Sequence, residues 1–153
     1  MILLSRRDLL KLSALSVLPI NLVCSLARAA VSPPKKRILV VDSDVDVHEA
    51  ARNLLSDAGY SVEIADTAEA GIEQAKANHF DAFLTDNFLS DSAGYDLFVE
   101  LRRITPNSPV LLMTRFAFDP TKSAFKFRRD GGDFLLFKPF RKQWLLDALE
   151  RLV

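Results

Sequence analysis

Four residues that could act together in one reaction each stand at the end of a short apolar run. These residues are Asp42, Asp86, Thr114 and Lys138. Short runs of this kind are typical of buried strands in a parallel sheet. Because chemistry in open α/β sheets takes place at the carboxyl ends of the strands, we expect the four side chains to lie close together.

Two carboxylates at one edge of a sheet repel each other unless a hard divalent cation such as Mg²⁺ neutralises them. A carboxylate can also attack a phosphoryl group and form an acyl phosphate. Catalysis of that transfer is mostly positioning and neutralisation of charge. The four residues therefore predict that Asp86 is the nucleophile and that Mg²⁺ bridges Asp42 and Asp86. The Thr114 hydroxyl and the Lys138 ammonium are expected to hold the remaining phosphoryl oxygens.

The elements that would position these residues alternate regularly along the chain. Five apolar runs are separated by stretches with helical spacing of apolar residues. The predicted strands are 37–42, 60–65, 81–86, 109–114 and 133–138, and the predicted helices are 44–58, 66–77, 94–104, 119–129 and 140–152. This βαβαβαβαβα order predicts an α/β fold, a doubly wound five-stranded parallel sheet with helices on both faces. The pattern from Asp66 to Glu69 is that of a capping box at the start of the second helix.

The composition argues against one class of function, nonspecific electrostatic binding to nucleic acid. The 153 residues fit one domain plus an appendage, and 49% apolar and 26% charged residues are ordinary for a globular protein. The net charge of +0 gives no electrostatic case for direct binding to nucleic acid. Cys24 is the single cysteine, so no intramolecular disulfide can form.

Residues 1–30 have the three parts of an export signal. Arg6 and Arg7 precede an apolar stretch at 12–26, and the small-residue triplet Ala27-Arg28-Ala29 follows it. The paired arginines resemble a twin-arginine signal, which would be cleaved after Ala29. Two alternatives stay open: an uncleaved membrane anchor, and a translation start further downstream. Residues 31–36, with two adjacent prolines, are predicted to be a linker to a domain at 37–153.

Residues 37–153 resemble the receiver domain of response regulators, which has a flavodoxin-like (βα)5 fold. The resemblance rests on Asp86 followed eight residues later by Gly94, on Met113-Thr114, and on Lys138-Pro139-Phe140. It implies that Asp86 accepts a phosphoryl group from a histidine kinase or a phosphotransfer protein. It also implies that the Phe88 backbone carbonyl is a ligand of Mg²⁺ and that the Lys138–Pro139 bond is cis.

The sequence departs from the family pattern at several positions. The family has two adjacent acids after the first strand, where this chain has Asp42 and Ser43. Either Ser43 or Asp44 could complete the metal ligands, although Asp44 is better explained as a helix N-cap. Arg115 replaces the usual small residue after the hydroxyl and could crowd or gate the pocket. Leu135 replaces the aromatic residue that serves as an output switch in the family.

Three functions are compatible with these residues. The first is a stand-alone phosphoacceptor receiver, not an enzyme beyond its own phosphorylation and dephosphorylation, which signals by protein contact through residues 115–138 and the last helix. The second is a degenerate receiver that binds a partner without phosphorylation. The third, a small phosphohydrolase, is disfavoured because Phe88 stands where a second aspartate would be needed.

The receiver function and the export signal predict different locations. A receiver works in the cytoplasm, where kinases and ATP are found. The signal predicts the periplasm, or the membrane if residues 1–30 are an uncleaved anchor.

Overall fold

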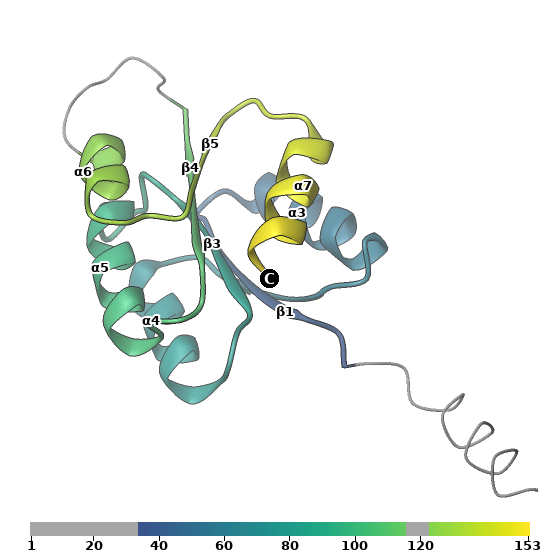
Figure 1. Cartoon of the computed structure of the whole chain (residues 1–153), viewed down its shortest axis with the longest axis horizontal. Helices are drawn as coiled ribbons and strands as arrows, with labels where there is room; N and C mark the ends of the chain where they lie inside the picture. Colours follow the sequence, from purple (N-terminus) through teal and green to yellow (C-terminus); the bar gives the residue numbers. More distant parts are fainter. Residues whose placement is uncertain (1–33, 116–122) are drawn as a thin grey trace, which may run out of the picture. The chain divides into compact units, whose positions relative to one another are not determined.

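The computed structural model describes residues 34–115 and 123–153, and residues Lys35–Val153 form one compact unit. Five strands alternate with five helices in this part of the chain (Figure 1). The strands are β1 (Arg37–Val41), β2 (Ser61–Ala65), β3 (Ala82–Asp86), β4 (Val110–Thr114) and β5 (Phe134–Phe137). The helices are α3 (Val45–Asp57), α4 (Ala68–Ala77), α5 (Gly94–Ile104), α6 (Ser123–Arg129) and α7 (Lys142–Leu152).

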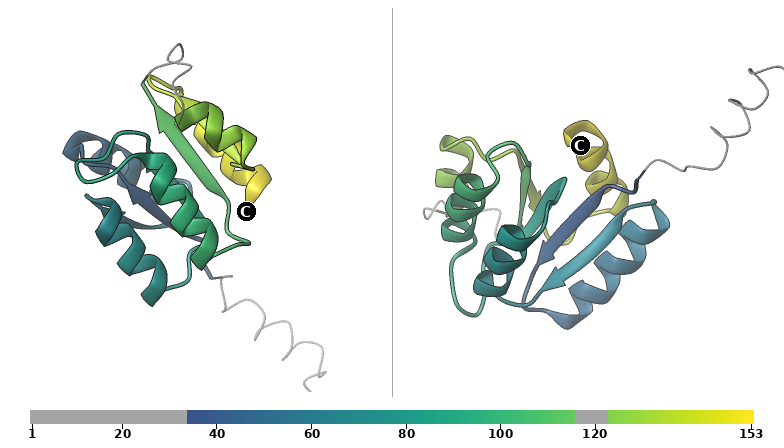
Figure 2. Two further views of the ribbon diagram at one scale, coloured as in Figure 1. Left: turned by 90° about the vertical axis from the view of Figure 1, so that its left-hand side faces the viewer. Right: turned by 90° about the horizontal axis from the view of Figure 1, so that it is seen from below.

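All five strands are parallel and lie in the order β2-β1-β3-β4-β5. Helices α4, α5 and α6 cover one face of the sheet, and α3 and α7 cover the other (Figures 1 and 2). The predicted doubly wound, flavodoxin-like fold is therefore confirmed. Edge strands β2 and β5 are only partly buried, whereas every residue of β3 and β4 is buried.

Each face of the sheet has its own apolar core, because successive strand residues point to opposite faces. On the α4–α6 face, Leu39 and Phe83 pack among Phe98, Leu101 and Phe127. On the α3–α7 face the core is formed by residues of β1, β3, β4, β5 and the two helices; among them are Ile38, Val40, Leu55, Leu84, Leu111, Leu145 and Leu149. Since both faces are covered, the three central strands need apolar side chains at nearly every position.

The strand register aligns the ends that carry the candidate residues. Val41 pairs with Thr85, so Asp42 and Asp86 lie next to each other at the carboxyl ends of β1 and β3. Asp86 pairs with Met113, and Thr114 pairs with Phe137. The residues that follow these pairs, Arg115 and Lys138, therefore emerge at the same edge of the sheet.

Helix ends agree with the sequence patterns except at α4. Asp44 is the N-cap of α3, as predicted, and its side chain accepts a hydrogen bond from the Asp46 amide. Gly59 follows α3 with a φ of 95°, a conformation that glycine adopts without steric cost. The capping box predicted to begin at Asp66 is displaced by one residue, because Thr67 is the N-cap of α4.

Some sequence predictions lie outside the described residues. The export signal or anchor at 1–30, its cleavage after Ala29, and part of the linker at 31–36 belong to this group. The proposed start of a helix at Asp119 also lies outside them, and α6 is described from Ser123 onward. Over 34–115 and 123–153, none of the helices has the length and apolar character needed to span a bilayer.

Candidate phosphoacceptor site

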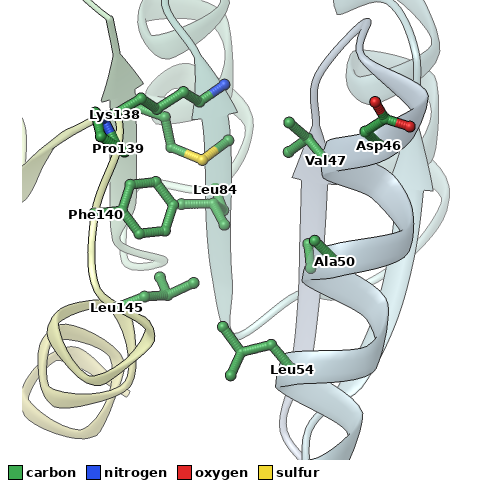
Figure 3. Close-up of a pocket in the computed structure, with 11 residues that line it drawn as sticks. Asp46, Val47, Ala50, Leu54, Leu84, Lys138, Pro139, Phe140 and Leu145 are labelled. Carbon is green, nitrogen blue, oxygen red and sulfur yellow. The ribbon is translucent and has the colours of Figure 1, made fainter.

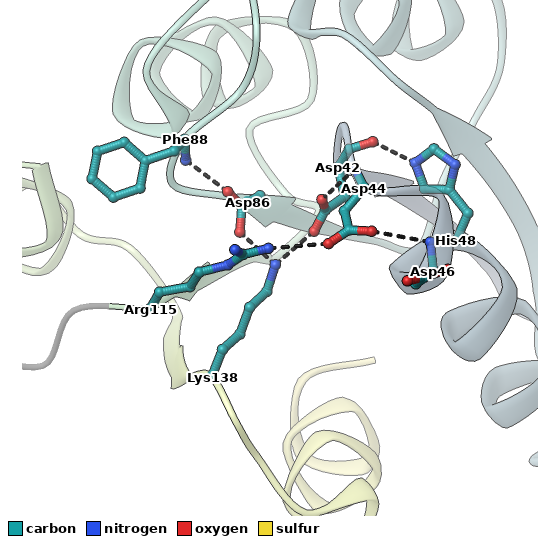
Figure 4. A network of polar contacts seen from close by, with 8 residues as sticks. All are labelled: Asp42, Asp44, Asp46, His48, Asp86, Phe88, Arg115 and Lys138. Carbon is teal, nitrogen blue, oxygen red and sulfur yellow. Dashed lines mark hydrogen bonds and ion pairs between the residues drawn. The ribbon is translucent and has the colours of Figure 1, made fainter.

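Lys138 joins the two buried carboxylates at the carboxyl edge of the sheet. Its ammonium lies 2.6 Å from Asp86 Oδ1 and 2.7 Å from Asp42 Oδ2 (Figure 4). The Asp42 and Asp86 side chains are 2% and 8% exposed, and that of Lys138 is 12% exposed. The ammonium thus provides positive charge to two acids that come from strands β1 and β3 and are largely shielded from water.

Strand β5 and the turn after it place Lys138 in this position. The Lys138 amide donates to the Thr114 carbonyl at 2.7 Å, which extends the pairing of β4 and β5 by one residue. The Lys138–Pro139 bond is cis, as the family resemblance implied. The side chain therefore leaves the end of β5 and reaches back over β4 to the acids on β3 and β1.

Backbone amides orient both carboxylates. The Phe88 amide donates to Asp86 Oδ2 at 2.8 Å, and the Asp44 amide donates to Asp42 Oδ1 at 2.9 Å. Each acid therefore has one oxygen bound by Lys138 and the other bound by the loop that follows its own strand. Hydrogen bonds of this kind restrict the rotation of a carboxylate.

Gly94 allows helix α5 to begin directly against the end of β3. A Cβ atom at position 94 would lie 2.2 Å from the Asp86 carbonyl oxygen and 2.9 Å from a methyl carbon of Leu112. No side chain fits at these distances. This close approach explains the glycine eight residues after Asp86, since the loop at 87–93 must turn back to the strand that it has just left.

The carboxylates lie in a pocket of about 320 Å³ whose rim carries polar side chains. Its lining residues are Asp42, Ser43, Asp44, Asp86, Phe88 and Arg115. Arg115 Nη2 donates to Asp44 Oδ2 at 3.1 Å. Asp44 therefore has its two oxygens engaged, one as the helix cap and one with Arg115, whereas Ser43 is exposed at the rim.

The predicted hydroxyl residue lies next to this pocket but is not among its lining residues. Thr114 is the last residue of β4 and is 1% exposed. It lies one position beyond Met113, the register partner of Asp86. The structure thus brings Asp42, Asp86 and Lys138 into direct contact and holds Thr114 on the neighbouring strand.

Two contacts around the site were not predicted from the sequence. The first is that of His48, whose Nε2 contacts the Asp42 backbone carbonyl (Figure 4). Asp91 accepts hydrogen bonds from the Ala68 and Glu69 amides at 2.9 and 3.0 Å, which ties the loop after Asp86 to the start of α4. The position of His48 one turn after the Asp44 cap was the available signal for its contact. Nothing local in the sequence indicates the long-range contact of Asp91.

The oxygen ligands present fit a Mg²⁺ site that has fewer acidic residues than the family pattern. Mg²⁺ binds one or two carboxylates, keeps several waters and takes substrate phosphate oxygens as ligands. Asp42 and Asp86 supply the two carboxylates, and the Phe88 backbone lies directly against Asp86. Within 34–115 and 123–153, no group of three or more acidic, histidine or cysteine side chains could hold a metal. The reduced set follows from Ser43, which replaces the second acid, and from Asp44, which pairs with Arg115.

A second hollow of about 340 Å³ lies between α3 and α7 and is almost entirely apolar (Figure 3). Val47 and Leu54 line it from α3, and Phe140 and Leu145 line it from the other side. Lys138 and Pro139 form the end nearest to the carboxylates. Asp46 is the only carboxylate among its lining residues, so this hollow lacks the pair of acids that lines the first pocket.

Solved structures of receiver domains have the same fold. A response regulator receiver domain protein (CheY-like) from Methanospirillum hungatei JF-1 aligns with a TM-score of 0.73 and 28% sequence identity, covering 77% of this chain and 93% of that chain. A response regulator from Burkholderia pseudomallei, with a phosphorylated aspartic acid, calcium ion and citrate, aligns with a TM-score of 0.69 and 27% identity. That alignment covers 75% of this chain and 66% of that one.

Sequence comparison agrees with the structural similarity. The response regulator receiver protein Anae109_2439 of Anaeromyxobacter sp. (strain Fw109-5) is 34% identical over 112 residues, which is 73% of this chain and 46% of that protein. The chain spans between a quarter and a half of the length of other curated relatives. The family model for the response regulator receiver domain matches residues 38–150. The chain therefore belongs to the response regulator receiver domain family.

Proposed function

We propose that the chain accepts a phosphoryl group on Asp86 in a two-component phosphorelay, with Mg²⁺ as the cofactor. The observation that carries the proposal is the Lys138 ammonium, which lies within 2.7 Å of both Asp42 and Asp86, two largely buried carboxylates that line a pocket at the edge of the sheet. A carboxylate in this position is shielded from bulk water but accessible to a phosphodonor. Receiver domains are phosphoacceptors, and the Burkholderia pseudomallei relative is described with a phosphorylated aspartic acid.

The residues around Asp86 have separate tasks in the transfer. The Phe88 amide holds one Asp86 oxygen and so orients the carboxylate. As an Asp86 oxygen bonds to phosphorus, the bond from phosphorus to the donor breaks and its electron pair leaves with the donor. The Lys138 ammonium then lies beside the acyl phosphate that has formed on Asp86. A bound Mg²⁺ supplies further neutralisation of the phosphoryl charge.

The test is chemical labelling of Asp86. Acetyl phosphate and Mg²⁺ should give a hydroxylamine-sensitive adduct whose mass and peptide location identify Asp86. Asp86→Asn should abolish labelling, whereas Asp96→Asn, which changes an exposed aspartate in the first turn of α5, should not. Equal labelling of the Asp86→Asn protein would contradict the assignment.

A degenerate receiver that binds a partner without phosphorylation is the second candidate function. The observation in its favour is the reduced metal site, in which Ser43 supplies no carboxylate and Asp44 is already paired with Arg115. Equilibrium titration with Mg²⁺ separates the two candidates. Absence of binding up to about 20 mM, well above the weakest extracellular-type affinities near 1 mM for a divalent ion, would favour the degenerate form.

The phosphodonor in the first candidate is a histidine kinase or a phosphotransfer protein, and the output is a contact with another protein. The surface expected to make that contact comprises residues 115–138 and α7, of which 116–122 lie outside the described residues. Phe137 and Trp144 are exposed on this surface. Direct binding to nucleic acid is not part of the proposal, because the net charge of the chain is +0.

The location of the chain is tested separately, because the signal pattern at 1–30 favours export whereas a phosphoacceptor works where kinases and ATP are found. Cleavage after Ala29 would leave Ala30 as the first residue, which can be read from protein purified after cell fractionation. Changing Arg6 and Arg7 to lysine should retain the protein inside the cell. A full-length chain in the membrane fraction would instead identify an anchor, and a cytoplasmic chain would agree with the location of kinases.

A further inference from the structure

The ion pair between Arg115 and Asp44 crosses the mouth of the pocket that contains Asp86. Arg115 directly follows β4, and Asp44 lies in the loop after β1. Since β3 lies between β1 and β4, a side chain that joins the ends of these two strands passes over the end of β3. Asp86 is the last residue of β3, and it lines the same pocket as Arg115 and Asp44 (Figure 4).

The solvent exposure of this ion pair allows Arg115 to exchange Asp44 for another partner. The Arg115 side chain is 60% exposed and that of Asp44 is 38% exposed. A pair with this exposure contributes little to stability, because water screens the charges. Asp44 also remains the N-cap of α3 through its other oxygen. Arg115 could therefore leave Asp44 without disturbing the start of α3.

The charges in the pocket favour such an exchange when phosphate arrives. Three acids, Asp42, Asp44 and Asp86, surround two cations, Lys138 and Arg115, which gives 2 − 3 = −1. A phosphoryl group on Asp86 adds further negative charge to the pocket that Arg115 also lines. Arginine binds phosphate oxygens through paired hydrogen bonds, which makes them better partners than one exposed carboxylate oxygen.

We propose that Arg115 is a phosphoryl-binding residue that exchanges Asp44 for the phosphate oxygens of the donor, and then for those of the group on Asp86. The inference deepens the proposed function and rests on Asp86 as the acceptor. Arg115 neutralises part of the phosphoryl charge that a metal held by a second acid at position 43 would otherwise balance. Asp44 holds the guanidinium over the pocket until phosphate displaces it.

Equilibrium binding of inorganic phosphate, measured with Mg²⁺ present, tests the exchange without any reaction. Arg115→Ala should weaken phosphate binding about tenfold, the effect of losing one charge-assisted interaction. Asp44→Asn keeps an N-cap side chain but releases Arg115, so it should tighten phosphate binding about threefold. Arg103→Ala removes an arginine of similar exposure on α5 and serves as the matched control.

Labelling kinetics with acetyl phosphate extend the test to the donor. Arg115→Ala should raise the concentration of acetyl phosphate needed for half-maximal rate about tenfold, and Arg115→Lys should lie between Arg115→Ala and wild type. Wild-type phosphate affinity in Arg115→Ala would overturn the inference. Weaker phosphate binding in Asp44→Asn would also overturn it, because Asp44 would then act as a ligand of the metal. Absence of labelling in the wild type would instead count against the proposed function of Asp86.

Discussion

At the scale of single residues, Lys138 neutralises two buried acids at once. It is the cation that lies between Asp42 and Asp86, both of which are almost fully shielded from solvent. A buried acid that loses its counter-charge is destabilised far more than an exposed one, because water no longer solvates it. The ammonium proposed to serve phosphoryl transfer is therefore also expected to support folding.

Replacement of Lys138 by methionine should lower the free energy of unfolding by about 3 kcal/mol, the range observed when one member of a buried ion pair is removed. Urea unfolding followed by circular dichroism measures this change. Adding Asp42→Asn to the Lys138→Met protein should restore about 1 kcal/mol, because one of the two opposed acids is then neutral. Lys142→Met is the control, since Lys142 is an exposed lysine at the start of α7. A Lys138→Met protein as stable as this control would show that the ammonium contributes nothing to folding.

At the scale of elements, the loop at 87–93 leads from β3 into α5 and also contacts the start of α4. Its end lies against β3 because Gly94 admits no side chain there. Its middle is held by Asp91, which accepts hydrogen bonds from the first amides of α4. These bonds lower the pKa of the Asp91 carboxyl below its usual value, chiefly through the Ala68 amide. The loop is thus held at its middle and at its end by contacts within the chain.

Replacement of Asp91 by alanine should lower the free energy of unfolding by about 1 kcal/mol at pH 7, as expected for the loss of a helix cap. A folded-state pKa below the unfolded value near 3.9 means that the contribution of the charged carboxylate is present above that pH. It is lost as the pH falls below about 3.9 and through the lower folded value. The difference in free energy of unfolding between wild type and Asp91→Ala should therefore shrink between pH 5 and pH 3, as measured by urea unfolding. The decrease should be on the order of the capping energy itself.

Asp57→Ala provides the comparison, because Asp57 is an exposed acid at the last position of α3. An acid at a helix C-terminus interacts unfavourably with the helix dipole, so its removal should not destabilise the fold. If the Asp91→Ala difference were the same at pH 7 and pH 3, the carboxylate charge would not contribute to the cap.

At the scale of the whole molecule, the sheet could be predicted from the sequence because its strands are marked by the same local signal. A strand covered on both faces must be apolar at nearly every position, and runs such as 38–41 and 110–113 meet this condition. Alternation with amphipathic helices then leaves few topologies. Local patterns predicted the start of α4 less well. Its cap is completed by Asp91, which lies 23 positions from Ala68 in the sequence.

The site could be predicted only in part for the same reason. Asp42, Asp86 and Lys138 stand at strand ends, so the topology alone brings them to one edge of the sheet. The contacts of Arg115 with Asp44 and of His48 with the Asp42 carbonyl depend on side-chain conformations. Such conformations are determined by tertiary packing and leave no periodic signal in the sequence.

The affinity of the site for Mg²⁺ can be measured through the stability of the whole domain, because a ligand that binds only the folded state raises its melting temperature. At ten times the dissociation constant, Mg²⁺ should add about 1.4 kcal/mol, or roughly 3–6 °C for a domain of this size. Asp42→Asn should abolish the shift, and a chelator should reverse it in the wild type.

Ser43→Asp adds the acid that the family pattern contains, at an exposed position on the rim of the pocket. This variant should reach the same shift at a Mg²⁺ concentration about tenfold lower, since each 1.4 kcal/mol of added attraction is a factor of ten. If the melting temperatures of wild type and Ser43→Asp rise equally and at the same Mg²⁺ concentration, Ser43 does not limit the metal site. If Mg²⁺ changes neither melting temperature, the phosphorylation-independent module is favoured.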